Sequence, residues 1–311
     1  MKFVLGTINL GTELDLNDSF KLLDAAVERG IDRVDTADIY GRRPGEGWTE
    51  QLLGRWLSAR PGLRDHLRVA TKLYLPFSTD PNDRGLGAWH LRLGVDAALA
   101  RLRVERLDYL LLHHYDDDTP LDETYGELAA LQRDGKVAEL GTCNHSAWQL
   151  GHAVSAARAA GASQPMVEQS PYNLLNRGVE ADLLAAAGAL QIEFWAWSPL
   201  ARGILAGMRR RQARGDNAGR LAVPGVVTWL QNNADSITAY EMLCEHWGLS
   251  PPRVAMSWLA ARGVDAAVIG PRSLAQLTEL TEAPLVMTPE QLGELDAIFP
   301  GGVRRDGPPH H

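Results

Sequence analysis

Four side chains that could move or stabilise protons stand at the ends of short apolar segments. Asp35 and Lys72 each end such a segment, His113 follows a third, and Tyr40 lies five residues beyond Asp35. Free tyrosine has a pKa of about 10, too high for efficient proton exchange at neutral pH. An ammonium group beside the phenol stabilises the phenolate, so Lys72 is expected to lower the pKa of Tyr40.

The lysine needs a counter-charge, because an unpaired buried ammonium is costly. Asp35 can supply it, which makes Asp35 the group that positions Lys72 and Tyr40 the group that transfers the proton. His113 can polarise a carbonyl group or share the proton. Tyrosine, lysine, aspartate and histidine converging on one place favour carbonyl reduction or alcohol oxidation.

These side chains meet only if the segments before them are parallel strands whose carboxyl ends share one face. The apolar segments predict eight strands, at residues 3–5, 32–35, 67–72, 107–112, 137–142, 166–168, 193–197 and 266–269. Helices are predicted between the strands, and a last helix at residues 289–298. We expect Asn17 or Asp18 to cap the first helix and Ser146 to cap the fifth. The sixth helix is expected at residues 180–190.

Regular alternation of strands and helices favours a (β/α)8 barrel. A doubly wound sheet would need a G-x-G-x-x-G turn after its first strand, which residues 6–11 do not supply. We expect one barrel domain over residues 1–300, a tail over residues 301–311, and long loops after the third and seventh strands. The loop after the seventh strand contains the helix breakers Gly215, Gly219 and Pro224.

The composition is typical of a globular protein, with 311 residues, 45% of them hydrophobic and 23% charged. A net charge of -8 disfavours nucleic acids and anionic membranes as partners. No apolar run approaches the about 18 residues that span a bilayer. The two cysteines, Cys143 and Cys244, lack metal-ligand spacing, so we expect a cytoplasmic protein without a metal site.

Seven stretches together resemble the aldo-keto reductase family, and the resemblance covers nearly the whole chain. They are VDTADIYG (34–41), ATK (70–72), LDYLLLH (107–113), GTCN (141–144), QSPYNLLN (169–176), WSPL (197–200) and VIGPRS (268–273). The resemblance implies a catalytic tetrad of Asp35, Tyr40, Lys72 and His113, with Tyr40 as the general acid in reduction. It assigns this role to His113 rather than to the neighbouring His114.

The same resemblance implies that NADPH binds across the barrel mouth. Asn144 and Gln169 would hold the carboxamide, and Trp197 would stack on the nicotinamide ring. The remaining contacts would come from the loops after strands seven and eight, namely Ser198, Leu200, Gly203, Gly270, Arg272, Ser273, Gln276 and Glu279. Arginine suits the 2′-phosphate of NADPH independently of the resemblance, because its planar fork matches phosphate.

The chain departs from the family pattern in three places. Cys143 stands where serine is usual, and a thiol is a poorer hydrogen-bond donor. Leu280 replaces an asparagine that often reaches the adenine. Many members close the barrel floor with an N-terminal β-hairpin, whereas this sequence begins at its first strand. We therefore expect the N- or C-terminal segment to close the floor.

The substrate wall is expected from residues in or near the mouth loops: Trp48, Trp89, His114 and Trp229. The leading hypothesis is NADPH-dependent reduction of an aldehyde or ketone. An alternative is a regulatory or scaffold protein of the same superfamily that binds the cofactor with little turnover. A metal-dependent barrel hydrolase ranks last, because Asn9 stands where paired histidines would be needed. The substrate and the oligomeric state are left open.

Overall fold

Eight parallel strands close into a barrel, as the sequence predicts. The structure is a computed structural model, and it describes residues 1–41, 46–213, 215 and 226–301. Each strand pairs with the next in the chain, and β8 returns to β1. The strands are β1 (Lys2–Gly6), β2 (Arg33–Asp35), β3 (Arg68–Leu73), β4 (Leu107–Leu112), β5 (Val137–Cys143), β6 (Val167–Pro171), β7 (Glu193–Trp197) and β8 (Ala266–Ile269).

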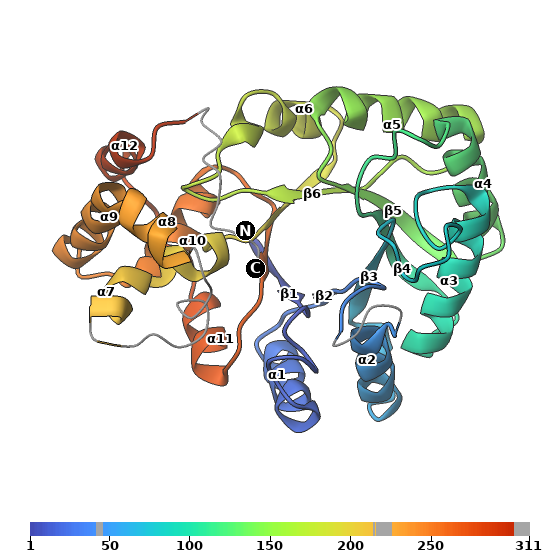
Figure 1. The fold of residues 1–311 in the computed structure, drawn as a ribbon, viewed down its shortest axis with the longest axis horizontal. Coiled ribbons are helices and arrows are strands. Elements are labelled where there is room, and N and C mark those ends of the chain that lie inside the picture. Colours follow the sequence, from blue (N-terminus) through green and yellow to red (C-terminus); the bar gives the residue numbers. More distant parts are fainter. Residues whose placement is uncertain (42–45, 214, 216–225, 302–311) are drawn as a thin grey trace.

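Helices surround the strands (Figure 1). The α-helices are α1 (Leu16–Glu28), α2 (Trp48–Ser58), α3 (Ala88–Leu102), α4 (Leu121–Arg133), α5 (Ala147–Ala160), α6 (Leu183–Ala189), α7 (Met208–Ala213), α8 (Val226–Asn232), α9 (Ala234–His246), α10 (Pro251–Ala261), α11 (Leu274–Leu280) and α12 (Pro289–Ile298). The described residues also form three 3₁₀ segments: η1 (Leu63–Asp65), η2 (Gly178–Glu180) and η3 (Ala201–Ala206). None of the described helices has the length and apolar character needed to cross a membrane.

Alternation along the strands divides the apolar side chains into two cores. In β4, Leu110 packs outward against the helices, whereas Tyr109 and Leu111 point into the barrel. The strand period of two residues explains this division. In β3 the same alternation directs Thr71 outward and Lys72 inward, so the sequence of one strand delivers a lysine to the barrel interior.

Side chains of the strands themselves fill the amino-terminal end of the barrel. The Arg33 guanidinium, at the start of β2, lies 5.4 Å from the ring centre of Trp195 and donates to the Glu193 carboxylate at 2.7 Å. Tyr109 packs edge-on against Trp195, with ring centres 5.7 Å apart. Among the described residues these side chains pack together at this end of the barrel; the C-terminal tail, one of the two segments expected to close the floor, lies outside the described residues.

Three details of the predicted elements are wrong. The N-cap of α1 is Asp15, whose carboxylate accepts from Asp18 N at 2.9 Å, because the helix begins earlier than its apolar stripe indicates. The predicted helix at residues 180–190 is divided into η2 and α6. The stretch after β7 is not a plain loop, since it contains η3, α7 and α8. Residues 42–45, Gly219, Pro224 and the tail from residue 302 lie outside the described residues.

Two helical glycines give a matched test of the packing between α2 and α3. A Cβ at Gly54 would lie 2.2 Å from the backbone oxygen of Arg101, whereas a Cβ at Gly126 would meet nothing within 4 Å. Gly54→Ala is expected to lower the free energy of unfolding by roughly 2 kcal/mol or more, because backbone cannot yield cheaply. Gly126→Ala should raise it by about 0.5–1 kcal/mol through helix propensity.

Urea denaturation of both variants beside wild type measures this difference. Equal stabilities of the two alanine variants would contradict the close approach of α2 to α3.

Candidate active site

A buried ion pair joins the ends of β2 and β3. The Lys72 ammonium donates to the Asp35 carboxylate at 2.7 Å and to the backbone oxygen of Thr36 at 2.8 Å, and Lys72 is 1% exposed. Asp35 also accepts from Gln169 Nε2 at 2.8 Å, across the barrel from β6. The sequence prediction that Asp35 is the counter-ion of Lys72 is confirmed.

Tyr40 and His113 lie beside this pair. Lys72 Nζ is 5.1 Å from the ring centre of Tyr40, and the rings of Tyr40 and His113 meet edge-on with centres 6.3 Å apart. The turn after β2 is held by hydrogen bonds from Tyr40 N to Ala37 O and from Thr49 N to Tyr40 O, both 3.1 Å. All four side chains singled out in the sequence are therefore brought together.

The expected direction of the Tyr40 pKa shift is wrong. Burial raises the pKa of Tyr40, and the Lys72 ammonium lowers it, but burial prevails and the net shift is upward. The phenol is thus protonated at neutral pH, which suits a proton donor. Lys72 still acts in the expected direction, because without it burial would raise the pKa of Tyr40 further.

The charge states of the neighbours follow from the same balance. Burial lowers the pKa of Lys72, but the Asp35 carboxylate together with Tyr40 and Cys143 outweighs burial, so the net shift is upward and the ammonium stays charged. Burial, together with the charges on Lys72 and His114, holds the pKa of His113 well below its ordinary value. A neutral imidazole can donate one hydrogen bond to a carbonyl oxygen.

Asn144, Gln169 and Trp197 stand at the ends of β5, β6 and β7. Asn144 has a left-handed backbone with φ 59°, which asparagine tolerates better than most residues. Its Nδ2 donates to the backbone oxygen of His113, and its Oδ1 accepts from Trp197 Nε1, each at 3.0 Å. An amide nitrogen has a second hydrogen and an amide oxygen a second lone pair. Asn144 and Gln169 can therefore still bind a carboxamide.

The backbone turns sharply after β7, where three further candidates lie. Ser198 has φ 55° and Gly203 has φ 95°, with Leu200 between them at the start of η3. Ser198 Oγ accepts from Arg202 N at 3.1 Å. This turn follows Trp197 directly, so these residues lie next to the indole in the chain.

The stretch after β8 holds the remaining cofactor candidates. Ser273 caps α11 and accepts from Gln276 N at 3.2 Å, while Gln276 Oε1 accepts from Arg272 N at 2.9 Å. Arg272 pairs with Glu13 at 2.8 Å, and Gly270 O accepts from Asn9 Nδ2 at 3.0 Å. Glu279 lies near the end of α11, partly buried.

The expected substrate-wall residues are scattered. The ring of His114 stacks on His113, with centres 5.6 Å apart. Trp48 packs against the backbone of Gly11 and Gly41. Trp89, at the start of α3, is 69% exposed, and Trp229 of α8 packs on the main core. Only His114 touches a member of the group around Lys72 in a described ring contact.

Sequence reasoning missed a buried carboxylate behind Asn144. Glu168 of β6 accepts from the hydroxyls of Thr142 and Ser170, both at 2.6 Å, and from His145 N at 3.3 Å. Burial raises the pKa of Glu168 to about 7, although these donors oppose the rise. The sequence does carry a signal for this buried carboxylate. Glu168 is a glutamate within a buried strand, and it lies opposite Thr142 of β5.

A second buried acidic group lies behind Lys72. Glu50 of α2 accepts from Thr71 and pairs with Arg101 at 2.6 Å. Asp38 is 1% exposed, and burial followed by the Glu50 charge raises the pKa of Asp38 to about 7. These groups connect the loop bearing Tyr40 to α2 and α3.

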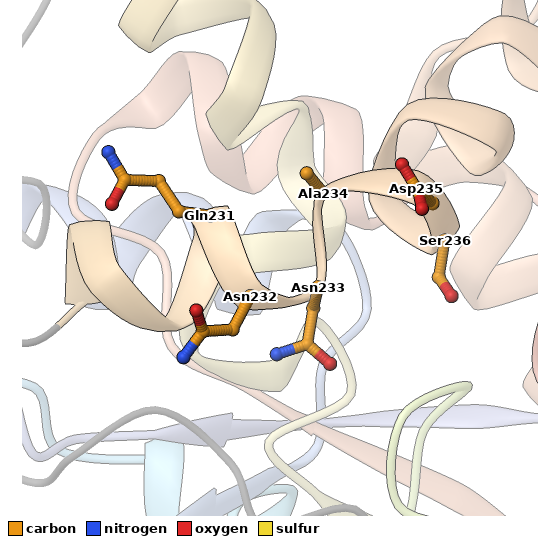
Figure 2. Close-up of a pocket in the computed structure, with 6 residues that line it drawn as sticks. All are labelled: Gln231, Asn232, Asn233, Ala234, Asp235 and Ser236. Atoms are coloured by element: carbon orange, nitrogen blue, oxygen red, sulfur yellow. The ribbon is translucent and has the colours of Figure 1, made fainter.

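A separate depression of about 200 Å³ lies at the junction of α8 and α9 (Figure 2). It is lined by Gln231, Asn232, Asn233, Ala234, Asp235 and Ser236. The side chains in Figure 2 point away from one another, and Figure 1 places α8 and α9 across the molecule from β3 and β4. We assign it no function. In the described part of the chain no group of three or more His, Cys, Asp or Glu side chains could hold a metal ion.

Glu168 predicts a pH-dependent stability. Its folded pKa of about 7 lies above the ordinary 4.5, so the folded state binds more protons between these values and the free energy of unfolding falls as pH rises through this window. Glu168→Gln is expected to remove the part of this fall that is due to Glu168, about a few kcal/mol, while the part due to Asp38 remains in both proteins. Denaturation of both proteins from pH 4 to pH 8 measures it, and parallel stability curves would contradict it.

Comparisons with known proteins agree with this architecture. The chain matches the model of the "Aldo/keto reductase family" over residues 2–299. It is 33% identical to "Uncharacterized oxidoreductase YrpG" of Bacillus subtilis, covering 96% of this chain and 92% of that protein. It is 27% identical to the rice protein "Probable voltage-gated potassium channel subunit beta", over 96% of this chain and 92% of that protein. It is 29% identical to mouse "Aflatoxin B1 aldehyde reductase member 2", over 89% of this chain and 78% of that protein. The chain belongs to the aldo/keto reductase family and is an oxidoreductase.

Proposed function

We propose that this chain uses NADPH to reduce the carbonyl group of an aldehyde or ketone to an alcohol, reversibly. The observation that carries the proposal is the Lys72 ammonium, which binds the Asp35 carboxylate at 2.7 Å and lies 5.1 Å from the ring centre of Tyr40. A charged group in this position stabilises the phenolate that forms when the phenol gives up its proton.

Each member of the group has a distinct task. NADPH supplies the hydride that the carbonyl carbon accepts. Tyr40 donates its proton to the carbonyl oxygen, and Lys72 stabilises the phenolate that remains. Asp35 keeps Lys72 charged and in place. Neutral His113 orients the carbonyl oxygen by a hydrogen bond, which places the oxygen between two donors.

Three side chains of the mouth would hold the nicotinamide end of the cofactor. Asn144 and Gln169 retain hydrogen-bonding capacity for the carboxamide, beyond the bonds they make within the chain. The hydrogen bond from Trp197 to Asn144 fixes the indole beside the carboxamide site, where it can stack on the nicotinamide ring. Cys143 is buried in the barrel interior, and burial raises the pKa of its thiol well above the ordinary value, so we assign it packing rather than cofactor binding.

The loops after β7 and β8 would hold the phosphates. Ser198, Leu200 and Gly203 would line the pyrophosphate path. Arg272, with Ser273 and Gln276, would bind the 2′-phosphate, which favours NADPH over NADH because an arginine fork matches phosphate. The remaining contacts in this region would come from Gly270 and Glu279.

A regulatory role is the alternative, and the name of the rice relative is what raises it. Such a protein would bind the cofactor with little turnover. The four side chains of the proposed tetrad are all present and in contact range, which favours turnover. Sustained NADPH consumption with a carbonyl compound distinguishes the two functions.

Removing the Tyr40 hydroxyl tests the proposed proton donor. Tyr40→Phe is expected to lower kcat about 100- to 10,000-fold, the usual contribution of a general acid, with NADPH affinity retained. Tyr125→Phe is the matched control, because the Tyr125 hydroxyl is buried in α4 without a hydrogen-bond partner among the described residues. Turnover is followed by NADPH absorbance and binding by NADPH fluorescence. An active Tyr40→Phe protein would refute the mechanism.

Arg272 tests the cofactor preference. Arg272→Ala is expected to raise the KM for NADPH about tenfold or more, through loss of a charge-assisted contact, and to change the KM for NADH little. Arg92→Ala is the control, since Arg92 is a surface arginine of α3 paired with Glu127 at 2.8 Å. Equal effects on both cofactors would argue against 2′-phosphate recognition by Arg272.

A further inference from the structure

Five ring side chains lie beside the site described above, and ring contacts or a hydrogen bond link four of them, all except His114. They are His114 and Tyr115, which follow β4, and His145, Trp148 and His152, which follow β5 or lie in α5; we name this set the ring shelf. Tyr115 is its centre, with ring centres 5.4 Å from both His145 and Trp148. Tyr115 Oη also forms a hydrogen bond with His152 Nδ1 at 3.2 Å.

The ring shelf begins at the proposed catalytic histidine. His114 stacks on His113, with ring centres 5.6 Å apart and planes 17° from parallel. His145 immediately follows Asn144, which binds the backbone oxygen of His113. β4 and β5 are neighbours in the barrel, so the segments that follow them meet at its mouth (Figure 1). The ring shelf therefore adjoins the reaction centre through the two segments that follow β4 and β5.

The outer end of the ring shelf is open. Trp148 is 62% exposed, although it lies in the first turn of α5, and its ring meets that of Tyr115 at 63°. Two rings at this angle form a corner, which offers a flat ligand one face and one edge. Single exposed apolar residues are common on protein surfaces. A tryptophan in ring contact with both Tyr115 and His152, next to the mouth, is better explained as a binding surface.

The fold holds Tyr115 in place through its neighbour. The buried Asp116 carboxylate accepts from Leu86 N and from the Thr119 hydroxyl, both at 2.7 Å, and so fixes the turn after β4 to the loop after β3. Asp117 and Asp118 follow it and are exposed. The Asp117 charge reaches the shelf, since burial and then Asp117 raise the pKa of Tyr115. Anionic ligands are therefore disfavoured at this end.

On the basis of the proposed function, we propose that the ring shelf is a distal substrate subsite that binds a flat aromatic ring remote from the reacting carbonyl. The substrate class is an elongated aryl-bearing aldehyde or ketone, neutral or cationic. The carbonyl lies at Tyr40 and His113, and the ring lies in the corner of Tyr115 and Trp148. Stacking and edge contacts supply the affinity, and the neighbouring acids select against carboxylates.

Binding of an unreactive alcohol tests the subsite without requiring turnover. The Kd of 5-phenylpentan-1-ol, measured by ligand-observed NMR on the full chain with NADPH, a pair that cannot exchange a hydride, is expected to rise about three- to tenfold in Trp148→Ala. Trp148→Phe, which keeps a flat ring, should remain close to wild type. Met242→Ala is the control, since Met242 of α9 is 64% exposed and distant in the fold. 5-Cyclohexylpentan-1-ol has the same length but no flat ring. It should therefore lose less affinity in Trp148→Ala than the phenyl alcohol does.

Turnover of the two corresponding aldehydes separates this proposal from the proposed function. In Trp148→Ala the ratio of kcat/KM for 5-phenylpentanal to that for 5-cyclohexylpentanal should fall about three- to tenfold. If wild type reduces neither aldehyde but binds the phenyl alcohol through Trp148, the proposed function fails and the subsite stands. Absent binding to wild type, an unchanged Kd in Trp148→Ala, or equal losses for both alcohols overturns the subsite.

Discussion

The ion pair between Lys72 and Asp35 is the constraint on which the rest of the site depends. A lysine that is 1% exposed would be strongly destabilising without a partner, so the fold must keep the carboxylate within reach. Parallel pairing of β2 with β3 does this, because it places Asp35 opposite Ala70, two residues before Lys72. The same carboxylate also binds Gln169, which links the pair to the opposite side of the barrel. One buried charge thus ties three strands together.

This pair also determines the charge state of the groups around it. Because Lys72 stays charged, it opposes the rise that burial causes in the pKa of Tyr40 and adds to the fall in the pKa of His113. A protonated phenol and a neutral imidazole therefore face the same space at neutral pH. Both can donate a hydrogen bond to one oxygen atom, which is the arrangement that reduction of a carbonyl group requires.

The sequence was sufficient for the barrel and for the group around Lys72, because both depend on local signals. Apolar segments that end in polar residues mark strands, and the strand order then places the ends together. The predicted bounds of β4, β7 and β8 equal the observed ones. The net shift of the Tyr40 pKa was not predictable, since it depends on how much burial the folded mouth imposes. The break between η2 and α6 and the helices after β7 were missed because these segments are short.

The buried acids behind the mouth were also missed, and the reason is physical. Glu168 and Glu50 act through partners on other elements, Thr142 and Thr71, so neither forms a local motif. Glu168 lies on the outer face of β6, whose inner face carries Gln169, and Glu50 of α2 meets the outer face of β3, whose inner face carries Lys72. Each of these two strand ends is thus polar on both faces, and the outer hydrogen bonds join β3 to α2 and β6 to β5. An inner ion pair can act as a fixed charge only if the strands that bear it cannot move apart, and the outer carboxylates supply that restraint.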